Sequence, residues 1–107
     1  MSDDALDRTY AALADPTRRA LLSALASGPA RISDLAAPIP MTFAGVSRHV
    51  RVLEEAGLVR RVIRGREHWL SLRPRGLAPA ERWIARQSRF WSGSADALAA
   101  RLERTKR

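Results

Sequence analysis

Apolar residues recur at helical spacing through the middle of the chain, along the segment that runs from Thr42 to Val59. Positions spaced by three, four and three residues share one face of an α-helix, so this pattern predicts a helix with a single buried stripe. Thr42 precedes the stripe and can cap the helix through its hydroxyl group, and Gly57 follows where a left-handed residue is expected. The stripe consists of Phe43, Val46, Val50 and Leu53.

The residues before this helix predict two more helices. Asp15–Pro16 has the form of an N-cap followed by proline at the first helical position, and Gly28–Pro29 ends that segment. The segment from Ile32 to Ala36 is a second, short helix, and Pro38–Ile39–Pro40 breaks the chain before Thr42. The short helix, the break and the helix at Thr42 together match a helix-turn-helix. The apolar face of the Asp15 helix is formed by Ala20, Leu21, Leu22 and Leu25.

A β-hairpin is predicted directly after Gly57. Leu58–Val59 and Val62–Ile63 have strand propensity, and Arg64–Gly65–Arg66 has the composition of a turn. The second strand is marked by Trp69, Leu70 and Leu72. The fold class that follows is mainly α with a small β-hairpin, in other words a winged helix-turn-helix. We expect one domain over residues 1–107, with a first helix at 4–14, the helix-turn-helix core at 15–57, the wing at 58–73 and a last helix at 77–104.

The last predicted helix is rich in aromatic residues. Its apolar positions repeat at helical spacing: Trp83, Ile84, Phe90, Trp91, Ala95, Leu98 and Leu102. Two tryptophans and a phenylalanine in nine residues exceed what a terminal helix needs to cover a small core. We therefore expect a two-fold dimer, with the first helix packed alongside; the alternative places the three rings in the core of one chain. The predicted dimer residues are Leu6, Tyr10, Trp83, Ile84, Phe90, Trp91 and Leu98.

The charge of the chain is strongly positive and unevenly distributed. The formal net charge is +8, and eight arginines lie between Arg48 and Arg75 against Glu54, Glu55 and Glu67. Such crowding repels itself, so a polyanionic partner explains it best. A basic protein can also meet an anionic membrane, but no segment approaches the ~20 apolar residues of a membrane span. The acidic first six residues lack the features of a signal peptide, so a cytoplasmic location and no membrane partner are expected.

The face of the Thr42 helix that lies away from the stripe carries small residues and arginines, which suits the major groove of double-stranded DNA. Phe43 is expected to be buried, the alternative being contact with a thymine methyl group. Gly45 costs roughly 1 kcal/mol of helix propensity relative to alanine, a cost explained either by close approach to DNA or by a poorly packed first turn. Wing arginines would hold the flanking phosphates. The predicted DNA-binding residues are Thr42, Ala44, Gly45, Ser47, Arg48, His49, Arg51, Arg64 and Arg66.

These motifs together resemble the ArsR-type winged helix-turn-helix regulators. The resemblance covers roughly Leu6 to Leu102, and Arg64–Gly65–Arg66 is similar to the wing tip of that family. It implies a small dimeric bacterial or archaeal repressor that binds an inverted-repeat operator and controls its own operon. The most specific matching residues are Leu13–Arg19, Ile32–Leu35 and Val46–Val59.

The signal that releases such a repressor is not predicted by the residues. Metal-sensing members use cysteine thiolates or clusters of His, Asp and Glu, and this chain has no cysteine. Its two histidines, His49 and His68, have no ligand-like residue three or four positions later. The chain therefore resembles the cysteine-free members, and we expect neither a metal site nor a cofactor. The inducer stays unknown.

Other classes of function are less well supported by the sequence. The chain has no phosphate loop and no nucleophile with a suggestive acid and base, so an enzyme is not expected. Glu54 and Glu55 point in different directions on a helix and are expected to be solvated. Two alternatives remain open: a winged helix that binds another protein, which Arg48 and Arg51 argue against, and a protein that binds nucleic acid without regard to sequence.

Overall fold

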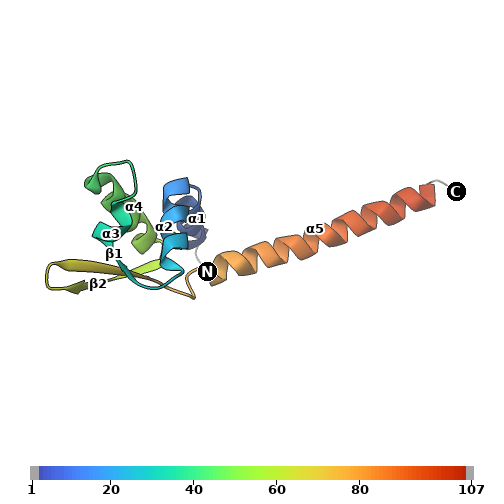
Figure 1. Cartoon of the computed structure of the whole chain (residues 1–107). Helices are drawn as coiled ribbons and strands as arrows, with labels where there is room; N and C mark the ends of the chain where they lie inside the picture. The colour runs from blue at the N-terminus through green and yellow to red at the C-terminus, as the bar shows by residue number, and fades with distance from the viewer. Residues whose placement is uncertain (1–2, 106–107) are drawn as a thin grey trace. The chain divides into compact units, whose positions relative to one another are not determined.

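The computed structural model describes residues 3–105 and contains five helices and three strands in this range (Figure 1). The chain divides into one unit that ends at Leu77 and a second that begins at Ala78. The elements follow in the order α1 (Asp3–Leu13), α2 (Pro16–Leu25), β1 (Ala30–Arg31), α3 (Ile32–Ala36), α4 (Phe43–Glu55), β2 (Val59–Arg64), β3 (Glu67–Leu72) and α5 (Ala78–Thr105).

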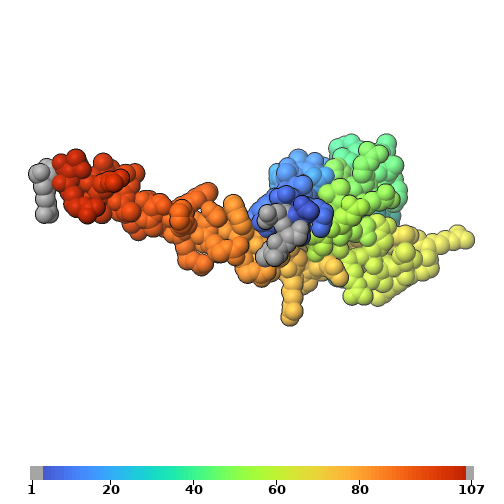
Figure 2. Space-filling view, turned by 180° about the vertical axis from the view of Figure 1, so that it is seen from behind, coloured from blue at the N-terminus to red at the C-terminus, as the bar shows by residue number. Residues whose placement is uncertain are grey.

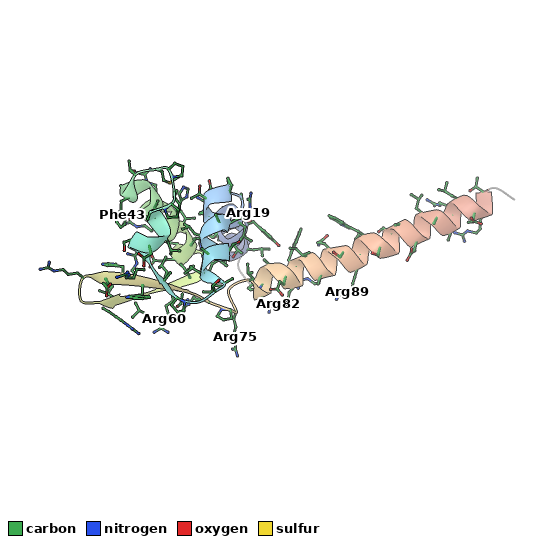
Figure 3. All side chains as sticks on the ribbon, in the orientation of Figure 1. Arg19, Phe43, Arg60, Arg75, Arg82 and Arg89 are labelled. Carbon is green, nitrogen blue, oxygen red and sulfur yellow. The ribbon has the colours of Figure 1, made fainter. Side chains whose placement is uncertain are left out.

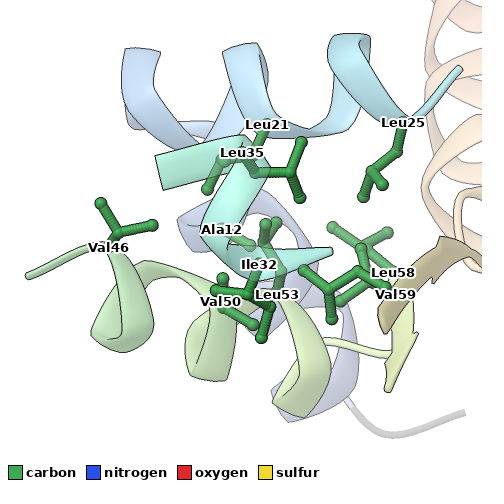
Figure 4. Close-up of a cluster of buried hydrophobic side chains, with 11 residues drawn as sticks. Ala12, Leu21, Leu25, Ile32, Leu35, Val46, Val50, Leu53, Leu58 and Val59 are labelled. Atoms are coloured by element: carbon green, nitrogen blue, oxygen red, sulfur yellow. The ribbon is translucent and has the colours of Figure 1, made fainter. Parts of the chain in front are cut away.

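The core of the first unit lies between α1, α2, α3, α4 and the strands β2 and β3 (Figure 4). The helices α2 and α4 contribute most of the apolar stripes that their spacing predicts, but Ala20 on α2 and Phe43 on α4 are exposed. Burial of such side chains is the main favourable contribution to folding, at about 25 cal/mol for each Å² of apolar surface. The core residues are Ala12, Leu21, Leu25, Ile32, Leu35, Val46, Val50, Leu53, Leu58, Val59 and Leu70.

The strands form a three-stranded antiparallel sheet in the order β1-β3-β2. The predicted hairpin is present, with Val59 opposite Leu72 at its base and Arg64 opposite Glu67 at its tip. In the space-filling view the hairpin, coloured yellow, projects from the first unit (Figure 2). The third strand, β1, was not predicted, because two residues are too short for a strand to show alternation. The winged helix-turn-helix fold is confirmed.

The expected burial of Phe43 is wrong. The other three residues of the predicted stripe are fully buried, whereas Phe43 is 59% exposed. Phe43 is the first residue of α4, so its side chain belongs to a helical turn that lies beyond the packed part of the stripe (Figure 3). Periodicity assigns a residue to a face but does not say how far along the helix that face is covered.

Gly76 lies unusually close to the backbone at the end of α4. A Cβ atom at Gly76 would lie 2.4 Å from the carbonyl oxygen of Gly57 and 3.2 Å from Cα of Leu58. These are backbone atoms and cannot give way as a flexible side chain could. The absence of a side chain at Gly76 therefore allows the segment after β3 to pass against the end of α4.

The second unit consists of α5, a helix of 28 residues. Its large apolar side chains are exposed, among them Phe90 at 70% and Trp91 at 65%. Arg82 and Arg89 project from one side of α5 (Figure 3), and none of the helices within residues 3–105 is both long enough and apolar enough to span a bilayer.

Candidate nucleic-acid interface

The first turn of α4 is held by its predicted cap. The Thr42 hydroxyl oxygen accepts a hydrogen bond from the backbone N–H of Gly45 at 3.1 Å. A Cβ atom at Gly45 would lie 3.3 Å from this hydroxyl oxygen and 3.5 Å from the sulfur of Met41. These distances are tight but not prohibitive, and a Thr cap is commonly followed by a Glu or Gln side chain at this position, so the cap alone does not require glycine here.

The last turn of α4 ends as the sequence predicts. Gly57 has a φ of +74°, its N–H donates to the carbonyl of Glu54 and the N–H of Leu58 donates to the carbonyl of Leu53, both at 3.0 Å. These two bonds form a Schellman motif, which stops a helix by satisfying its last carbonyl groups. Both ends of the helix are thus fixed by local chemistry, which sets the length of the surface that it presents.

The outer face of α4 is small near its start and cationic further along. Ala44, Arg48 and Arg51 are exposed, and Ser47 is half-buried beside them. Neither arginine has a hydrogen-bond or ion-pair partner within residues 3–105. Two unpaired guanidinium groups beside short side chains can reach base edges or phosphates, because arginine donates from a planar fork.

One side of α4 is fastened to α1 and α2 by Arg18. The guanidinium group of Arg18 donates to the carbonyl oxygens of Ala11 and Ala12, both at 2.8 Å, near the end of α1. Its Nη1 lies 3.0 Å from Nδ1 of His49 on α4. Since arginine only donates, Nδ1 of His49 must accept in this contact, and one residue links three helices.

Asp15 completes this group of side chains. Its carboxylate caps α2 by accepting from the backbone N–H of Arg18 at 3.0 Å, and it lies 3.9 Å from Nδ1 of His49. The hydrogen bond from the Arg18 backbone holds the pKa of the Asp15 carboxyl below its usual value; partial desolvation opposes this shift, and the positive charge of Arg18 supports it. Asp15 is therefore an ionised carboxylate beside α4 at neutral pH.

The other side of α4 is fastened to the wing. Arg61 on β2 donates to both carboxylate oxygens of Glu54, at 2.6 and 3.2 Å, and its Nη1 lies 3.0 Å from Nδ1 of His68. The expectation that Glu54 is simply solvated is wrong, since its partner follows seven residues later on the adjoining strand. Arg61 is consequently held by the protein and is not one of the arginines available to a polyanion.

The wing turns sharply at Gly65, which has a φ of +63°. Arg64 pairs with Glu67 across the turn, and positive φ at the first of two central residues is the pattern of a type II′ hairpin. The exposed side chains of Arg64 and Arg66 flank this glycine. Two cations thus stand at the tip of a short, rigid hairpin.

Trp69 lies near two arginines on the wing. The guanidinium carbons of Arg31 and Arg64 lie 5.9 and 6.0 Å from the ring centroid, and the indole Nε1 is buried with no hydrogen-bond partner among residues 3–105. Arg31 also pairs with Glu67 at 2.6 Å and Asp34 at 3.0 Å, and these hydrogen bonds raise the pKa of its guanidinium group. Arg31 therefore ties the base of α3 to the wing tip.

A groove of about 200 Å³ lies between α3, the start of α4 and the wing. Phe43 and Ser47 line it from α4, and Arg66 lines it from the wing tip. The remaining lining residues are Ile32, Ser33, Arg61, Glu67 and His68. The groove brings an exposed aromatic ring, a hydroxyl group and a cation together at the start of α4.

The predicted dimer residues fall into two groups. Leu6 and Tyr10 on α1 are half-buried. Those on α5 are exposed: Trp83, Ile84, Phe90, Trp91 and Leu98. For metal binding, the described part of the chain contains no group of three or more His, Asp and Glu side chains that could hold an ion.

The comparisons with known proteins agree with this geometry. A family model described as a helix-turn-helix domain matches residues 13–62. The transcriptional regulator Rv2034 of Mycobacterium tuberculosis is 40% identical over 86 residues, which is 80% of this chain and 78% of the relative. The transcriptional regulator CmtR of Mycobacterium bovis is 40% identical over 80 residues, covering 75% of this chain and 68% of its own length.

Solved structures identify the family. A crystal structure of an ArsR family transcriptional regulator superposes with a TM-score of 0.82 at 35% identity, covering 86% of this chain and 95% of the other. The chain belongs to the ArsR family. As a member of this family of DNA-binding transcriptional regulators, it is not an enzyme. The helix-turn-helix and wing described above are the parts of an ArsR regulator that its sequence signature predicts.

Sequence reasoning missed the residues that hold this interface in place. Arg18 belongs to the quoted family motif, but its spacing from His49 gives no sign that the two side chains meet. The Glu54–Arg61 ion pair could have been predicted, because the two opposite charges lie on either side of the predicted end of the helix, one on the helix and one on the strand that follows. Phe43 also carried a signal, because a capped helix often leaves its first side chain uncovered.

Proposed function

We propose that the protein is a dimeric repressor that binds an inverted-repeat operator and controls its own operon. The observation that carries this proposal is the outer face of α4, where Arg48 and Arg51 are exposed and unpaired within residues 3–105 beside the small Ala44. A helix that enters the major groove needs short side chains near the bases and donors around them. Ser47 and Arg48 are the residues proposed to contact base edges, and Arg51 the flanking backbone.

The wing is proposed to hold phosphates beside the operator. Arg64 and Arg66 stand at the tip of a hairpin whose backbone is fixed by its turn. Their cationic side chains need only a phosphate, so their contribution is independent of base sequence and falls with salt concentration. His49 is left out of the proposed contact surface, because its Nδ1 accepts from Arg18 on the side of α4 that faces α2. Thr42 and Gly45 are assigned to the helix cap.

The second copy of the chain is proposed to pair through α5. Ile84, Trp91 and Leu98 are spaced by seven residues and are all exposed, and such a repeat favours packing against another helix. Leu6 and Tyr10 on α1 are proposed to join this interface. A winged helix-turn-helix fragment from Mycobacterium bovis that shares the fold at 22% identity and a TM-score of 0.64 is a homodimer. Two-fold protein symmetry is mirrored in the half-sites of a DNA target, hence the inverted repeat.

The test is selection of bound duplexes from a random pool, followed by affinity measurements at fixed salt concentration. We expect an inverted repeat to be enriched and to bind at least about a thousandfold more tightly than random DNA of equal length. The duplex should match a sequence upstream of the protein's own gene. Equal affinity for all duplexes at fixed salt would contradict the proposal and favour sequence-independent nucleic-acid binding. Repression then requires that the protein lowers transcription from a promoter that carries this operator.

A further inference from the structure

The ring of Phe43 is exposed, and the described part of the chain leaves most of it uncovered. Phenylalanine side chains are usually buried, because removing their large apolar surface from water favours folding. Phe43 is nevertheless 59% exposed at the first position of α4, and Met41 just before it is 40% exposed. Thr42 caps this first turn of α4 and holds it in place, so the Phe43 ring projects from an ordered part of the backbone.

The surroundings of Phe43 exclude most apolar partners. Arg66 and Ser47 line the same groove, and Arg48 and Arg51 lie unpaired on the next face of the helix. A second copy of this chain would bring like charges together, which costs free energy. The partner must therefore be a polyanion that also offers an apolar group at the depth of the first helical turn.

Double-stranded DNA offers one such group on its bases. In the major groove each base pair presents hydrogen-bond donors and acceptors, and the 5-methyl group of thymine is the apolar feature among them. The first residues of a recognition helix are those that contact base edges. Phe43 occupies this position, and Ser47, one turn further along, adds a hydroxyl group that can donate to the O4 atom of the same base.

We infer that Phe43 is a specificity-determining residue, whose ring packs on the methyl group of one thymine in each half of the operator. This inference rests on the proposed function, because it requires that α4 reads an operator. It adds an apolar contact to those proposed for Ser47 and the arginines, and it states which chemical group the operator must carry. A thymine is needed at one position of each half-site for its methyl group and not for its base pairing.

The experiment replaces thymine by uracil, which removes the methyl group and leaves base pairing unchanged. Each thymine of the selected operator is replaced in turn, and affinity is measured for the wild type, Phe43→Ala and Phe43→Leu. We expect one position per half-site at which uracil weakens wild-type binding about fourfold, as loss of one buried methyl group would. Phe43→Ala should bind the thymine operator more weakly and lose its sensitivity at that position, whereas Phe43→Leu should keep part of it.

The matched control is Ile63→Ala, which removes an apolar side chain of similar exposure, 60%, from the wing. This variant should show the same uracil pattern as the wild type. The inference is overturned if no uracil replacement changes wild-type affinity. It is also overturned if uracil at the sensitive position weakens the binding of Phe43→Ala as much as it weakens that of the wild type. A protein without any preferred duplex would overturn the proposed function and this contact together, whereas a preferred duplex without uracil sensitivity would overturn the contact alone. Circular dichroism of Phe43→Ala and Phe43→Leu establishes that both variants are folded.

Discussion

Arginine side chains serve two separate purposes in this protein. Arg18, Arg31 and Arg61 are held by carbonyl or carboxylate groups of the chain itself and join one element to another. Arg48 and Arg66 have no such partner within residues 3–105 and extend to solvent. Net charge alone therefore overstates the cationic surface, because part of it is used internally. Only the unpaired arginines are candidates for contact with DNA.

Replacing Arg48 by alanine should lower sequence discrimination. A base-edge contact contributes about 1–3 kcal/mol of preference for the correct base, so affinity for the operator should fall more than affinity for random DNA. Arg66→Ala should weaken binding to both DNAs similarly and reduce the dependence on salt, as the loss of a phosphate contact does. Affinities measured over a range of salt concentrations test both variants. Equal losses for Arg48→Ala on both DNAs would reassign Arg48 to the phosphate backbone.

Replacing Gly76 by alanine should destabilise the first unit. The added Cβ would lie 2.4 Å from the carbonyl oxygen of Gly57, so the backbone must shift. Overpacking of this kind costs typically about 1–3 kcal/mol, measured as the free energy of unfolding in urea. Gly93→Ala is the control, because nothing lies within 4 Å of a Cβ at that position of α5. That control should be neutral or stabilising, since alanine favours a helix interior by about 1 kcal/mol.

At the scale of elements, α4 is the helix proposed to enter the major groove, and it is fastened on both sides. Arg18 joins it to α1 and α2 through His49, and Arg61 joins it to the wing through Glu54. The angle at which a recognition helix enters a groove decides which side chains reach base edges. We therefore expect these two fastenings to affect sequence reading without contacting DNA themselves.

Loss of the hydrogen-bond acceptor at His49 should lower operator affinity more than it lowers the stability of the fold. His49→Leu keeps an apolar side chain but gives Arg18 no acceptor, and we expect a threefold to tenfold loss of affinity, about the contribution of one hydrogen bond. His49→Asn keeps an oxygen near the position of Nδ1 and should restore most of this loss. Operator affinity and thermal unfolding are measured in parallel for both variants. A loss in His49→Asn as large as in His49→Leu would show that the ring, and not the hydrogen bond, matters.

The sequence predicts elements well where their chemistry is local. The Thr42 cap and Gly57 fix the two ends of α4, and each acts only on residues within one helical turn of itself. Both ends could therefore be predicted from residue type. The two residues of β1 pair only through the distant β3 and have no pattern of their own. Contacts such as Arg18–His49, 31 residues apart, depend on how the helices pack. The exposed positions of Arg48, Arg64 and Arg66 could accordingly be predicted from the sequence, and the contacts that hold α4 in place could not.

At the scale of the whole molecule, most of the large hydrophobic residues that are exposed within residues 3–105 lie on α5. Contiguous apolar patches of this kind on a soluble chain usually mark an interface. Phe90 and Trp91 are the large rings at its centre, and the arginines Arg82 and Arg89 project from one side of the same helix. An apolar stripe beside a charged side is the form of a helix that packs against another.

Substitution of Trp91 by glutamate should break the dimer and weaken operator binding together. Trp91 is 65% exposed in one chain, and tryptophans at interface centres contribute about 2 kcal/mol or more. Sedimentation at micromolar concentration should show a monomer, with a parallel loss of affinity for the inverted repeat. Ser92→Glu adds the same charge at the next, exposed position and should remain dimeric. A monomeric Trp91→Glu that binds the full operator with wild-type affinity would refute the coupling.

Zinc, cobalt and nickel at micromolar concentration should leave operator binding unchanged. The chain has no cysteine, and Nδ1 of each of its two histidines already faces an arginine at 3.0 Å. Operator affinity is titrated with each metal in turn, with a chelator as the control. A large loss at stoichiometric metal that the chelator reverses would reveal a site assembled from residues of two chains.

The fluorescence of the three tryptophans can report separately on DNA binding by the wing and on self-association through α5. Trp69 lies on the wing with its indole N–H buried and without a hydrogen-bond partner in the described chain, whereas Trp83 and Trp91 lie exposed on α5. An indole shielded from water emits at shorter wavelength than one in contact with it. Variants that retain a single tryptophan would therefore separate the fluorescence of the wing on DNA from that of α5 on self-association. The order of the two events could then be followed in time without an added label.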